Sequence, residues 1–270
     1  MAGEPIPRLN VLGVRVHAVD YARATAEIVR AAEERRAFAA TALAVHGVMT
    51  GRVDPDQRAR LDRLDLVTPD GQPVRWALNW LHGAGLADRV YGPLLTLRVC
   101  AAAAAAGLPV FLFGSTAEVL AKLAAGLVAR TPGLRIAGRQ ASRFRIATAR
   151  EWDDDVRAIR ASGARIVFCG LGCPRQEAWA HAMRRQLDLP IVAVGAAFPL
   201  WAGVQPMAPA WMQRAGLEWL FRLGREPRRL AHRYLTYNPR FAAGVMRQKL
   251  QPDAYPIPDT AYEPPELLWS

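Results

Sequence analysis

An aspartate directly after a short apolar run is the first candidate for chemistry in this sequence. The segment Thr68-Pro69-Asp70-Gly71 follows the apolar run 64–67, which reads as a strand. Ligands of open parallel sheets bind beyond the carboxyl ends of the strands, so Asp70 would lie where it could accept a proton from a substrate. An aspartate before a glycine is also typical of a helix cap or an Asx turn, and this alternative stays open.

A glycine turn later in the chain is suited to hold phosphate groups. Gly170 and Gly172 stand between a predicted strand and a predicted helix. The first helical turn then presents three polar residues, Arg175, Gln176 and Glu177. Exposed amides and the helix dipole attract an anion such as a diphosphate. Arg175 occupies the third glycine position of the GxGxxG pattern, so the turn is not that dinucleotide fingerprint, and Gln176 and Glu177 fit ordinary helix starters as well.

A second strand-to-helix turn, Gly114-Ser115-Thr116, offers hydroxyl and amide groups to a nucleotide or a sugar. Ser115 and Glu118 have the spacing of a capping box, in which the serine would cap the following helix and the glutamate would reach back to the cap. Capping explains these residues as well as ligand binding does.

The run Asp153-Asp154-Asp155 resembles the acidic motif with which many nucleotide-sugar enzymes hold a divalent metal ion. Thr148 and Glu151 form a capping box immediately before it, and the helix dipole favours acids in a first helical turn. We therefore expect a helix start here. The five histidines are dispersed without metal-binding spacing, so neither a metal site nor a cofactor is expected.

Positive charge is concentrated near the carboxyl end of the chain. The formal net charge is +11, and the segment 214–249 holds nine positive and two negative residues, which gives +7. Aromatic and aliphatic side chains interleave with these arginines, a combination suited to an anionic membrane surface. A terminal helix packed on its own domain, with solvated arginines, is the alternative. No aromatic pattern for base stacking accompanies the charge, so we expect no nucleic-acid partner.

The elements that must position these residues alternate along the chain. Short apolar runs alternate with helical patterns, which predicts an α/β fold with a Rossmann-like, mostly parallel sheet flanked by helices. The predicted strands cover residues 11–16, 39–45, 64–67, 109–113, 165–169 and 191–194. The predicted helices cover residues 21–35, 74–81, 94–106 and 116–130, and another begins near residue 174.

The alternation stops near residue 205, and helical patterns then dominate to about residue 250. We therefore predict a body over residues 1–205, a basic amphipathic helical appendage over residues 206–250 and an irregular tail over residues 251–270, which contains several prolines and acids. The apolar faces around residues 94–106 fit a subunit contact as well as a core, so a homo-oligomer stays open.

The cysteines and the apolar segments of the sequence indicate the cellular compartment of the protein. The three cysteines are odd in number and lie in apolar or glycine-rich contexts, which fits a reducing cytoplasm. The N-terminal residues MAGEPIPRLN do not have the pattern of a secretory signal. The most apolar window, 94–113, is interrupted by Arg98, Gly107 and Pro109, so any contact with the inner face of the membrane is expected to be peripheral.

Several of these segments, in this order and spacing, resemble the WecG/TagA/CpsF glycosyltransferase family over roughly residues 9–245. The resemblance is carried by TPDG at 68–71, GLGCPRQE at 170–177, VGAAF at 194–198, APAWM at 208–212, GLEWLFRL at 216–223 and EPRRL at 226–230. Members are inverting, metal-independent enzymes of cell-envelope polymer synthesis. They move an N-acetylmannosamine-type sugar from a UDP-sugar donor to a polyprenyl-diphosphate-linked N-acetylglucosamine acceptor, and the resemblance implies the same activity and partners here.

The resemblance also implies roles for individual residues. Asp70 corresponds to the base that takes the proton from the acceptor hydroxyl, and Gln176 matches a glutamine that contacts donor or acceptor. The glycine turn and the arginines of the appendage are expected to stabilise the departing diphosphate and to close over the pocket at the membrane. The residues expected to bind substrate are Thr41, His46, Gly71, Gly114, Ser115, Gly170, Gly172, Arg175, Glu177, Arg222, Arg228, Arg229 and Arg233.

Three positions depart from the family pattern. His46 follows Thr41 where members often carry a Thr-x-Asn, and His46 is expected to substitute for the asparagine. Met207 stands where members commonly have the arginine of RAP, and Pro199 stands where they have the aspartate of FD. These departures predict an altered sugar, a different acceptor or reduced activity. A catalytically silent nucleotide-binding scaffold at the membrane surface is therefore the alternative function.

Overall fold

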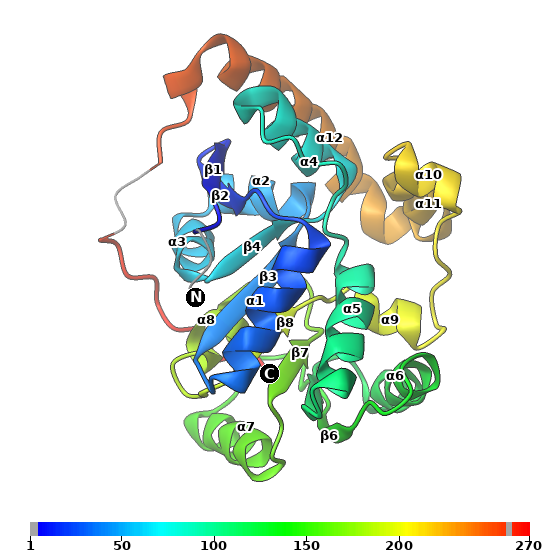
Figure 1. Ribbon diagram of the computed structural model, residues 1–270. Coiled ribbons are helices and arrows are strands. Elements are labelled where there is room, and N and C mark those ends of the chain that lie inside the picture. The colour runs from blue at the N-terminus through cyan, green and yellow to red at the C-terminus, as the bar shows by residue number, and fades with distance from the viewer. Residues whose placement is uncertain (1–4, 258–260) are drawn as a thin grey trace.

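A six-stranded sheet forms the centre of the computed structural model, which describes residues 5–257 and 261–270 (Figure 1). The strand order is β4-β3-β8-β7-β5-β6, and every pairing is parallel. The strands are β3 (Phe38–Leu43), β4 (Leu66–Pro69), β5 (Val110–Phe113), β6 (Ile136–Gln140), β7 (Ile166–Cys169) and β8 (Pro190–Ala193). The predicted α/β fold with a Rossmann-like parallel sheet is confirmed.

The inner strands are short runs of buried apolar residues. β5, β7 and β8 are buried along their whole length, as expected for parallel strands with helices on both faces. Successive side chains point to opposite faces of a strand. Phe111 and Phe113 of β5 therefore join one core, and Val110 and Leu112 join the other.

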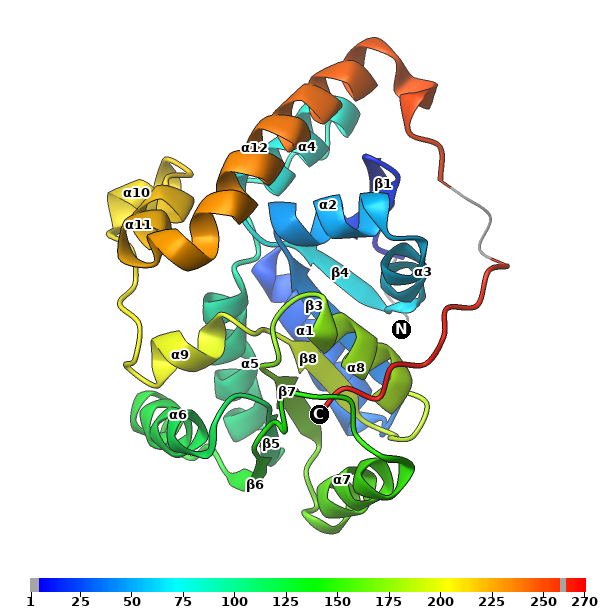
Figure 2. The same cartoon turned by 180° about the vertical axis from the view of Figure 1, so that it is seen from behind.

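Helices cover both faces of the sheet, and Figures 1 and 2 show them from opposite sides. One face packs against α1 (Tyr21–Glu33), α5 (Gly92–Ala105), α6 (Ala117–Arg130) and α9 (Ala197–Trp201). The other packs against α2 (Val45–Val53), α3 (Pro55–Arg63), α7 (Ala149–Ala161) and α8 (Arg175–Met183). The buried residues of α4 (Gln72–His82) join this second core.

The register of the sheet aligns the carboxyl ends of its strands. Pro69 at the end of β4 pairs with Leu43 on β3, and Cys169 at the end of β7 pairs with Ala193 on β8. β3 and β8 are themselves neighbours. The loops that follow these strands therefore leave from one edge of the sheet, where ligands of open α/β folds bind. Asp70, which follows Pro69 directly, begins one of these loops.

Helices dominate between residues 210 and 250, as predicted. α10 (Ala210–Arg214) and α11 (Glu218–Arg225) are short, and α12 (Pro227–Leu250) is long and lies along α2 and α4 (Figures 1 and 2). Phe241 and Val245 anchor α12 in the core. A 3-10 helix follows at Pro252–Ala254. No helix among the described residues is long and apolar enough to cross a bilayer. The division into a body, an appendage and a tail stays a prediction.

Several predicted details are corrected. Residues 11–16 do not form one strand, because a turn at Leu12-Gly13 separates β1 (Arg8–Val11) from its antiparallel partner β2 (Val14–His17). The cap of α6 is Thr116, whose hydroxyl accepts a hydrogen bond from the Val119 amide. Ser115 is not the cap, because it occupies the preceding turn with a φ of 60°. The helices α2 and α3 and the edge strand β6 were not predicted.

Candidate active site

Asp70 stands at the junction of β4 and α4. Its backbone amide donates to the carbonyl of Leu43 at 3.1 Å, which ties the residue to the end of β3. Gly71 then turns the chain into α4 with a φ of 92°, in the region that favours glycine. The helix begins at Gln72, and no side chain caps it. The cap interpretation of Asp70 is therefore wrong, and the carboxylate is free to face the loops at this edge.

The surroundings of Asp70 bring the pKa of its carboxyl close to neutral pH. Burial raises the pKa of its carboxyl to about 7, although Arg89 and Arg222 lower it and Glu218 raises it. The backbone amide of Gly92, in the first turn of α5, also hydrogen-bonds the carboxylate. A carboxyl with a pKa near the ambient pH can take up a proton in a reaction and release it afterwards.

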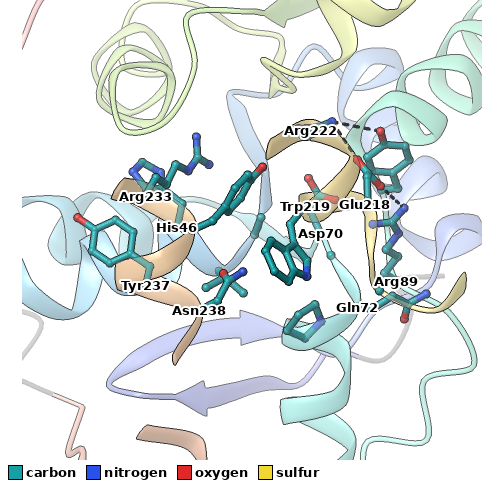
Figure 3. A pocket seen from close by; sticks show the side chains of 17 residues that line it. His46, Asp70, Gln72, Arg89, Glu218, Trp219, Arg222, Arg233, Tyr237 and Asn238 are labelled. Atoms are coloured by element: carbon teal, nitrogen blue, oxygen red, sulfur yellow. Dashed lines mark hydrogen bonds and ion pairs between the residues drawn. The ribbon is translucent and has the colours of Figure 1, made fainter. Parts of the chain in front are cut away.

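A chain of ion pairs connects α11 to Arg89 in the loop before α5 (Figure 3). Glu218 accepts from Arg89 at 2.7 Å through one oxygen and from Arg222 at 2.9 Å through the other. The Arg89 guanidinium lies 4.2 Å from the centre of the Tyr91 ring, and Arg222 donates to the Tyr91 hydroxyl at 3.3 Å. Arg89 and Glu218 are only 6% and 8% exposed, so solvent screens their charges weakly. The segment after residue 205 thereby contributes charges to the environment of Asp70.

A cavity of about 100 Å³ opens beside Asp70, and we call it the Asp70 cavity. It is lined by Ala44, Val45, His46, Asp70, Gly71, Gln72, Pro73, Arg89, Tyr91, Gly216, Glu218, Trp219, Arg222, Arg233, Tyr234, Tyr237 and Asn238. These residues come from the junctions β3–α2 and β4–α4 with the first turns of these two helices, from the loop before α5, from α11 and the loop before it, and from α12. The cavity is therefore closed by the C-terminal helices.

His46 occupies the wall of the Asp70 cavity (Figure 3). Its ring lies 5.4 Å from that of Tyr237 on α12. Burial, together with the charge of Arg233, lowers the pKa of His46 to about 4. Its Nδ1 atom is buried and has no hydrogen-bond partner among the described residues. His46 is therefore a neutral imidazole at pH 7 with one ring nitrogen left for a ligand.

A larger cavity of about 320 Å³ lies over the glycine turn between β7 and α8, and we call it the glycine-turn cavity. Gly170, Leu171, Gly172, Cys173, Gln176 and Glu177 line it from this turn, and Ser115, Val194, Gly195, Ala196 and Pro199 line it from neighbouring loops. A side-chain carbon on Gly170 would lie 2.3 Å from the Phe198 ring, so only glycine fits there. Gly172 faces open space instead, which exposes its backbone.

Gln176 and Glu177 form a polar network beneath the glycine-turn cavity. The Gln176 side chain donates to Glu177 at 2.8 Å and accepts from the Gly195 amide at 2.9 Å. Glu177 also accepts from the Thr41 hydroxyl at 2.8 Å. Glu177 is fully buried, and burial raises the pKa of its carboxyl, which favours the uncharged form. The network joins β3, α8 and the loop after β8.

The two cavities share one wall. Ala44, Asp70, Arg222, Arg233 and Tyr234 line both of them. The carboxylate and the glycine turn therefore border a common crevice at the carboxyl edge of the sheet, and α11 and α12 cover it. The carboxylate of Asp70 and the guanidinium groups of Arg222 and Arg233 line both cavities.

Some predicted site residues lie elsewhere. Thr41 is fully buried behind Glu177, and Gly114 packs against the backbone of Gly170, so neither lines a cavity. Arg175 is exposed, and its guanidinium lies 4.8 Å from the ring of Trp269, outside both cavities. Arg228 is exposed and also lies outside them. The side chain of Arg229 lies outside the part of the chain that the structure describes.

The acidic run 153–155 lies within α7, away from the crevice. The predicted capping box is present, with Thr148 and Glu151 bonded to each other's backbone amides. Asp155 is buried and pairs with Arg143 at 2.7 Å. Among the described residues, no group of three or more His, Cys, Asp or Glu side chains is placed to hold a metal ion. The interpretation of this run as a helix start is confirmed.

Sequence reasoning missed Arg89, Tyr91 and the pairing of Glu218. Arg89 and Tyr91 match no motif, although the Gly92-Pro93 helix start that follows them was a signal that they lie near a helix N-terminus. Glu218 was visible only as one acid in a basic segment. An acid between apolar residues and arginines is a sign of a buried ion pair, because such a charge is rarely buried without a partner.

One comparison with known proteins bears on this geometry. The family model described as "Glycosyl transferase WecG/TagA/CpsF family" matches residues 9–255, which is most of the chain. The match includes Asp70, the glycine turn and the α11–α12 cover. The chain therefore belongs to the WecG/TagA/CpsF glycosyltransferase family.

Proposed function

We propose that this glycosyltransferase moves an N-acetylmannosamine-type sugar from a UDP-sugar to a polyprenyl-diphosphate-linked N-acetylglucosamine, with inversion and without a metal ion. Family membership supports a glycosyltransferase of cell-envelope polysaccharide synthesis. The observation that carries the finer proposal is the shared crevice, in which Asp70 faces the same space as the glycine turn and two arginines. A single displacement at the anomeric carbon requires a base for the attacking hydroxyl and an anion site for the leaving diphosphate, and the two must lie close together.

In this proposal Asp70 acts on the acceptor. The oxygen of an acceptor hydroxyl attacks the anomeric carbon, and its proton passes to the Asp70 carboxylate. The bond between the anomeric carbon and the diphosphate oxygen breaks at the same time, and its electron pair leaves with UDP. Attack from the face opposite the leaving group inverts the configuration. A positioned base with a pKa of about 7 is well matched to this proton at neutral pH.

The departing diphosphate needs positive charge from the protein itself, because this proposal includes no metal ion. The backbone of Gly172 and the first turn of α8 face the glycine-turn cavity, where the helix dipole favours an anion. Arg222 and Arg233 reach the same cavity from α11 and α12. Guanidinium groups in a partly buried site stabilise developing negative charge more strongly than they would in water. These groups are our candidates for binding UDP.

The test is a transfer assay with UDP-N-acetylmannosamine and a diphosphate-linked N-acetylglucosamine acceptor in the presence of a chelator. Asp70→Asn is expected to lower kcat by a factor of about 10² to 10⁴ while UDP binding is retained. Asp188→Asn is the matched control, because Asp188 is an exposed carboxylate just before the amino end of β8, lines neither cavity and lies at the opposite end of the strand from the crevice. Wild-type turnover by Asp70→Asn would refute the assignment of the base, and a strict metal requirement would refute metal independence.

A catalytically silent nucleotide-binding scaffold is the second candidate, and one observation favours it. Pro199 lines the glycine-turn cavity, at the position where family members commonly carry an aspartate. A lost carboxylate inside the crevice could remove activity while leaving the anion site in place. UDP binding without transfer across a panel of UDP-sugars would support the scaffold and contradict the enzyme.

We place the protein on the inner face of the membrane by the surface of its C-terminal helices. Trp211, Leu220 and Leu235 are 59%, 46% and 66% exposed on α10, α11 and α12, and the same three helices carry several arginines. Apolar and cationic side chains together bind anionic lipid interfaces. The double variant Leu220→Asn/Leu235→Asn is expected to float less with anionic vesicles than the control Val128→Asn, which removes an exposed apolar side chain from α6. Equal flotation would contradict this placement.

A further inference from the structure

An apolar groove of about 560 Å³ runs between α4 and α12, which lie side by side in both views (Figures 1 and 2). Trp76 and Trp80, one turn apart on α4, form one wall and are 44% and 46% exposed. Met246 on the facing side of α12 is 51% exposed, and Phe241 and Val245 form the floor. Large apolar side chains that line an open groove indicate a ligand or a partner.

The groove adjoins the Asp70 cavity. Five residues line both spaces: Val45, Pro73, Gly216, Trp219 and Asn238. Trp219 lies between the two, and Figure 3 shows its indole beside Asp70 and Asn238. A long ligand could therefore extend from the carboxylate into the groove without leaving the protein surface.

Charge changes sharply along this path. The described residues that line the groove carry no charge, whereas the Asp70 cavity presents three arginines, Arg89, Arg222 and Arg233, against two acids, Asp70 and Glu218. A ligand that matches this order has an apolar chain, then an anionic group, then a hydroxyl that reaches the base. That order of groups is the order in a sugar joined through a diphosphate to an isoprenoid chain.

We infer that the groove between α4 and α12 binds the proximal isoprenoid units of the lipid-linked acceptor, an inference that rests on the proposed function. The chain lies against Trp76 and Trp80, its diphosphate lies where the groove adjoins the Asp70 cavity, and its sugar hydroxyl faces Asp70. The groove then selects acceptors by their chain and holds the diphosphate at a fixed distance from the base.

The chain offers a matched pair of variants. Ala242 and Ala243 are neighbouring exposed residues of α12, and only Ala242 lines the groove. Ala242→Trp should fill the groove, and Ala243→Trp should place the same ring in solvent. Neither residue touches the Asp70 or glycine-turn cavity. Circular dichroism melts of both variants check that each one folds.

The first measurement is equilibrium binding of farnesyl diphosphate and of isopentenyl diphosphate, by titration calorimetry without detergent. The wild type should bind the longer chain at least about tenfold more tightly, because the extra methylenes are removed from water. Ala242→Trp should lose that preference and Ala243→Trp should keep it. Equal affinity for the two diphosphates in the wild type would overturn the inference, as would a preference that survives in Ala242→Trp. A change in oligomeric state on light scattering, confined to Ala242→Trp, would make the groove a subunit contact instead.

The second measurement separates this inference from the proposed function. In the transfer assay, Ala242→Trp should raise KM for a farnesyl-linked acceptor by about tenfold and leave KM for an acceptor with a single isoprene unit unchanged. KM for the sugar donor should not move. An equal rise for both acceptors would overturn the groove assignment. A wild type that shows the chain-length preference in binding but no transfer would leave the groove standing and refute the transferase proposal.

Discussion

Removal of the ionisable group at position 70 is predicted to stabilise the protein. The folded protein holds the pKa of Asp70 at about 7, whereas the ordinary value is 3.8. Above pH 7 the folded state must therefore keep a charge that burial opposes, and the unfolded chain carries that charge freely. An asparagine side chain at this position would have nearly the same shape without the charge. Asp70→Asn should therefore remove the proposed base and make the folded protein more stable.

The sign and size follow from the two pKa values. A carboxyl whose folded pKa is raised adds stability at low pH, and that stability is lost as pH rises from the unfolded value toward the folded value. The difference of 7 minus 3.8 is about 3 units, which at 1.36 kcal/mol per unit gives a penalty of about 4 kcal/mol above pH 7. At pH 5 the penalty is only about 1.6 kcal/mol. Partial access of water to Asp70 makes both figures upper limits.

The assay is urea denaturation of the wild type and Asp70→Asn at pH 5 and pH 8. The free energy of unfolding of the variant should exceed that of the wild type, and this excess should be up to about 3 kcal/mol larger at pH 8 than at pH 5. Asp188→Asn, at an exposed site, is the control for charge removal itself and should show no comparable growth with pH. A variant that is less stable than the wild type at pH 8, or whose gain is the same at both pH values, would refute the argument that burial sets the pKa of Asp70.

Three further predictions concern the crevice. The rate constant kcat/KM should rise with pH through an apparent pKa near 7, because Asp70 must be ionised to accept a proton; a flat pH profile from pH 5.5 to 8.5 would contradict this. Glu218→Gln should lower the free energy of unfolding by about 3 kcal/mol, because it leaves the buried Arg89 without its carboxylate, and a thermal melt unchanged from the wild type would count against the ion pair. Glu177→Gln should keep activity within a few-fold of the wild type, because burial already favours the uncharged carboxyl that the amide mimics. Glu177→Ala should lose more activity, because it removes the acceptor of the Gln176 hydrogen bond. Equal activity of the two variants would contradict a positioning role for Glu177.

The sequence predicted the sheet and the edge that carries the crevice, because buried parallel strands are continuous apolar runs. β5, β7 and β8 could be read directly for this reason. β6 was missed because it is a half-exposed edge strand with a glycine and an arginine in the sequence Ile136–Gln140. α2 was missed because Val45–Val53 has no clear apolar stripe. α3 was overlooked although Asp54 and Pro55 form a typical helix start.

The polar details of the crevice were harder to predict, since they depend on contacts between distant segments. Arg89 and Glu218 are 129 residues apart, and neither residue alone indicates the other. The exposure of Arg175 was also hidden, because a residue in the first turn of a helix can face the ligand or the solvent. Gln176, the next residue, faces inward to Gly195 instead. Consecutive residues of a helix point about 100° apart around its axis, and only the packed structure shows which of them faces the crevice.

The pairing of β4 with β3 has a consequence for variants far from the crevice. Pro69 is aligned with Leu43, and the residue after it is Asp70. A slip of the two strands by a single residue would carry the carboxylate about 3.3 Å along the sheet and turn it to the opposite side. A substitution in the hydrophobic interior, at Leu66 for instance, could thereby silence the protein while leaving it soluble and folded. Inactive variants that map to the interior need not be misfolded ones.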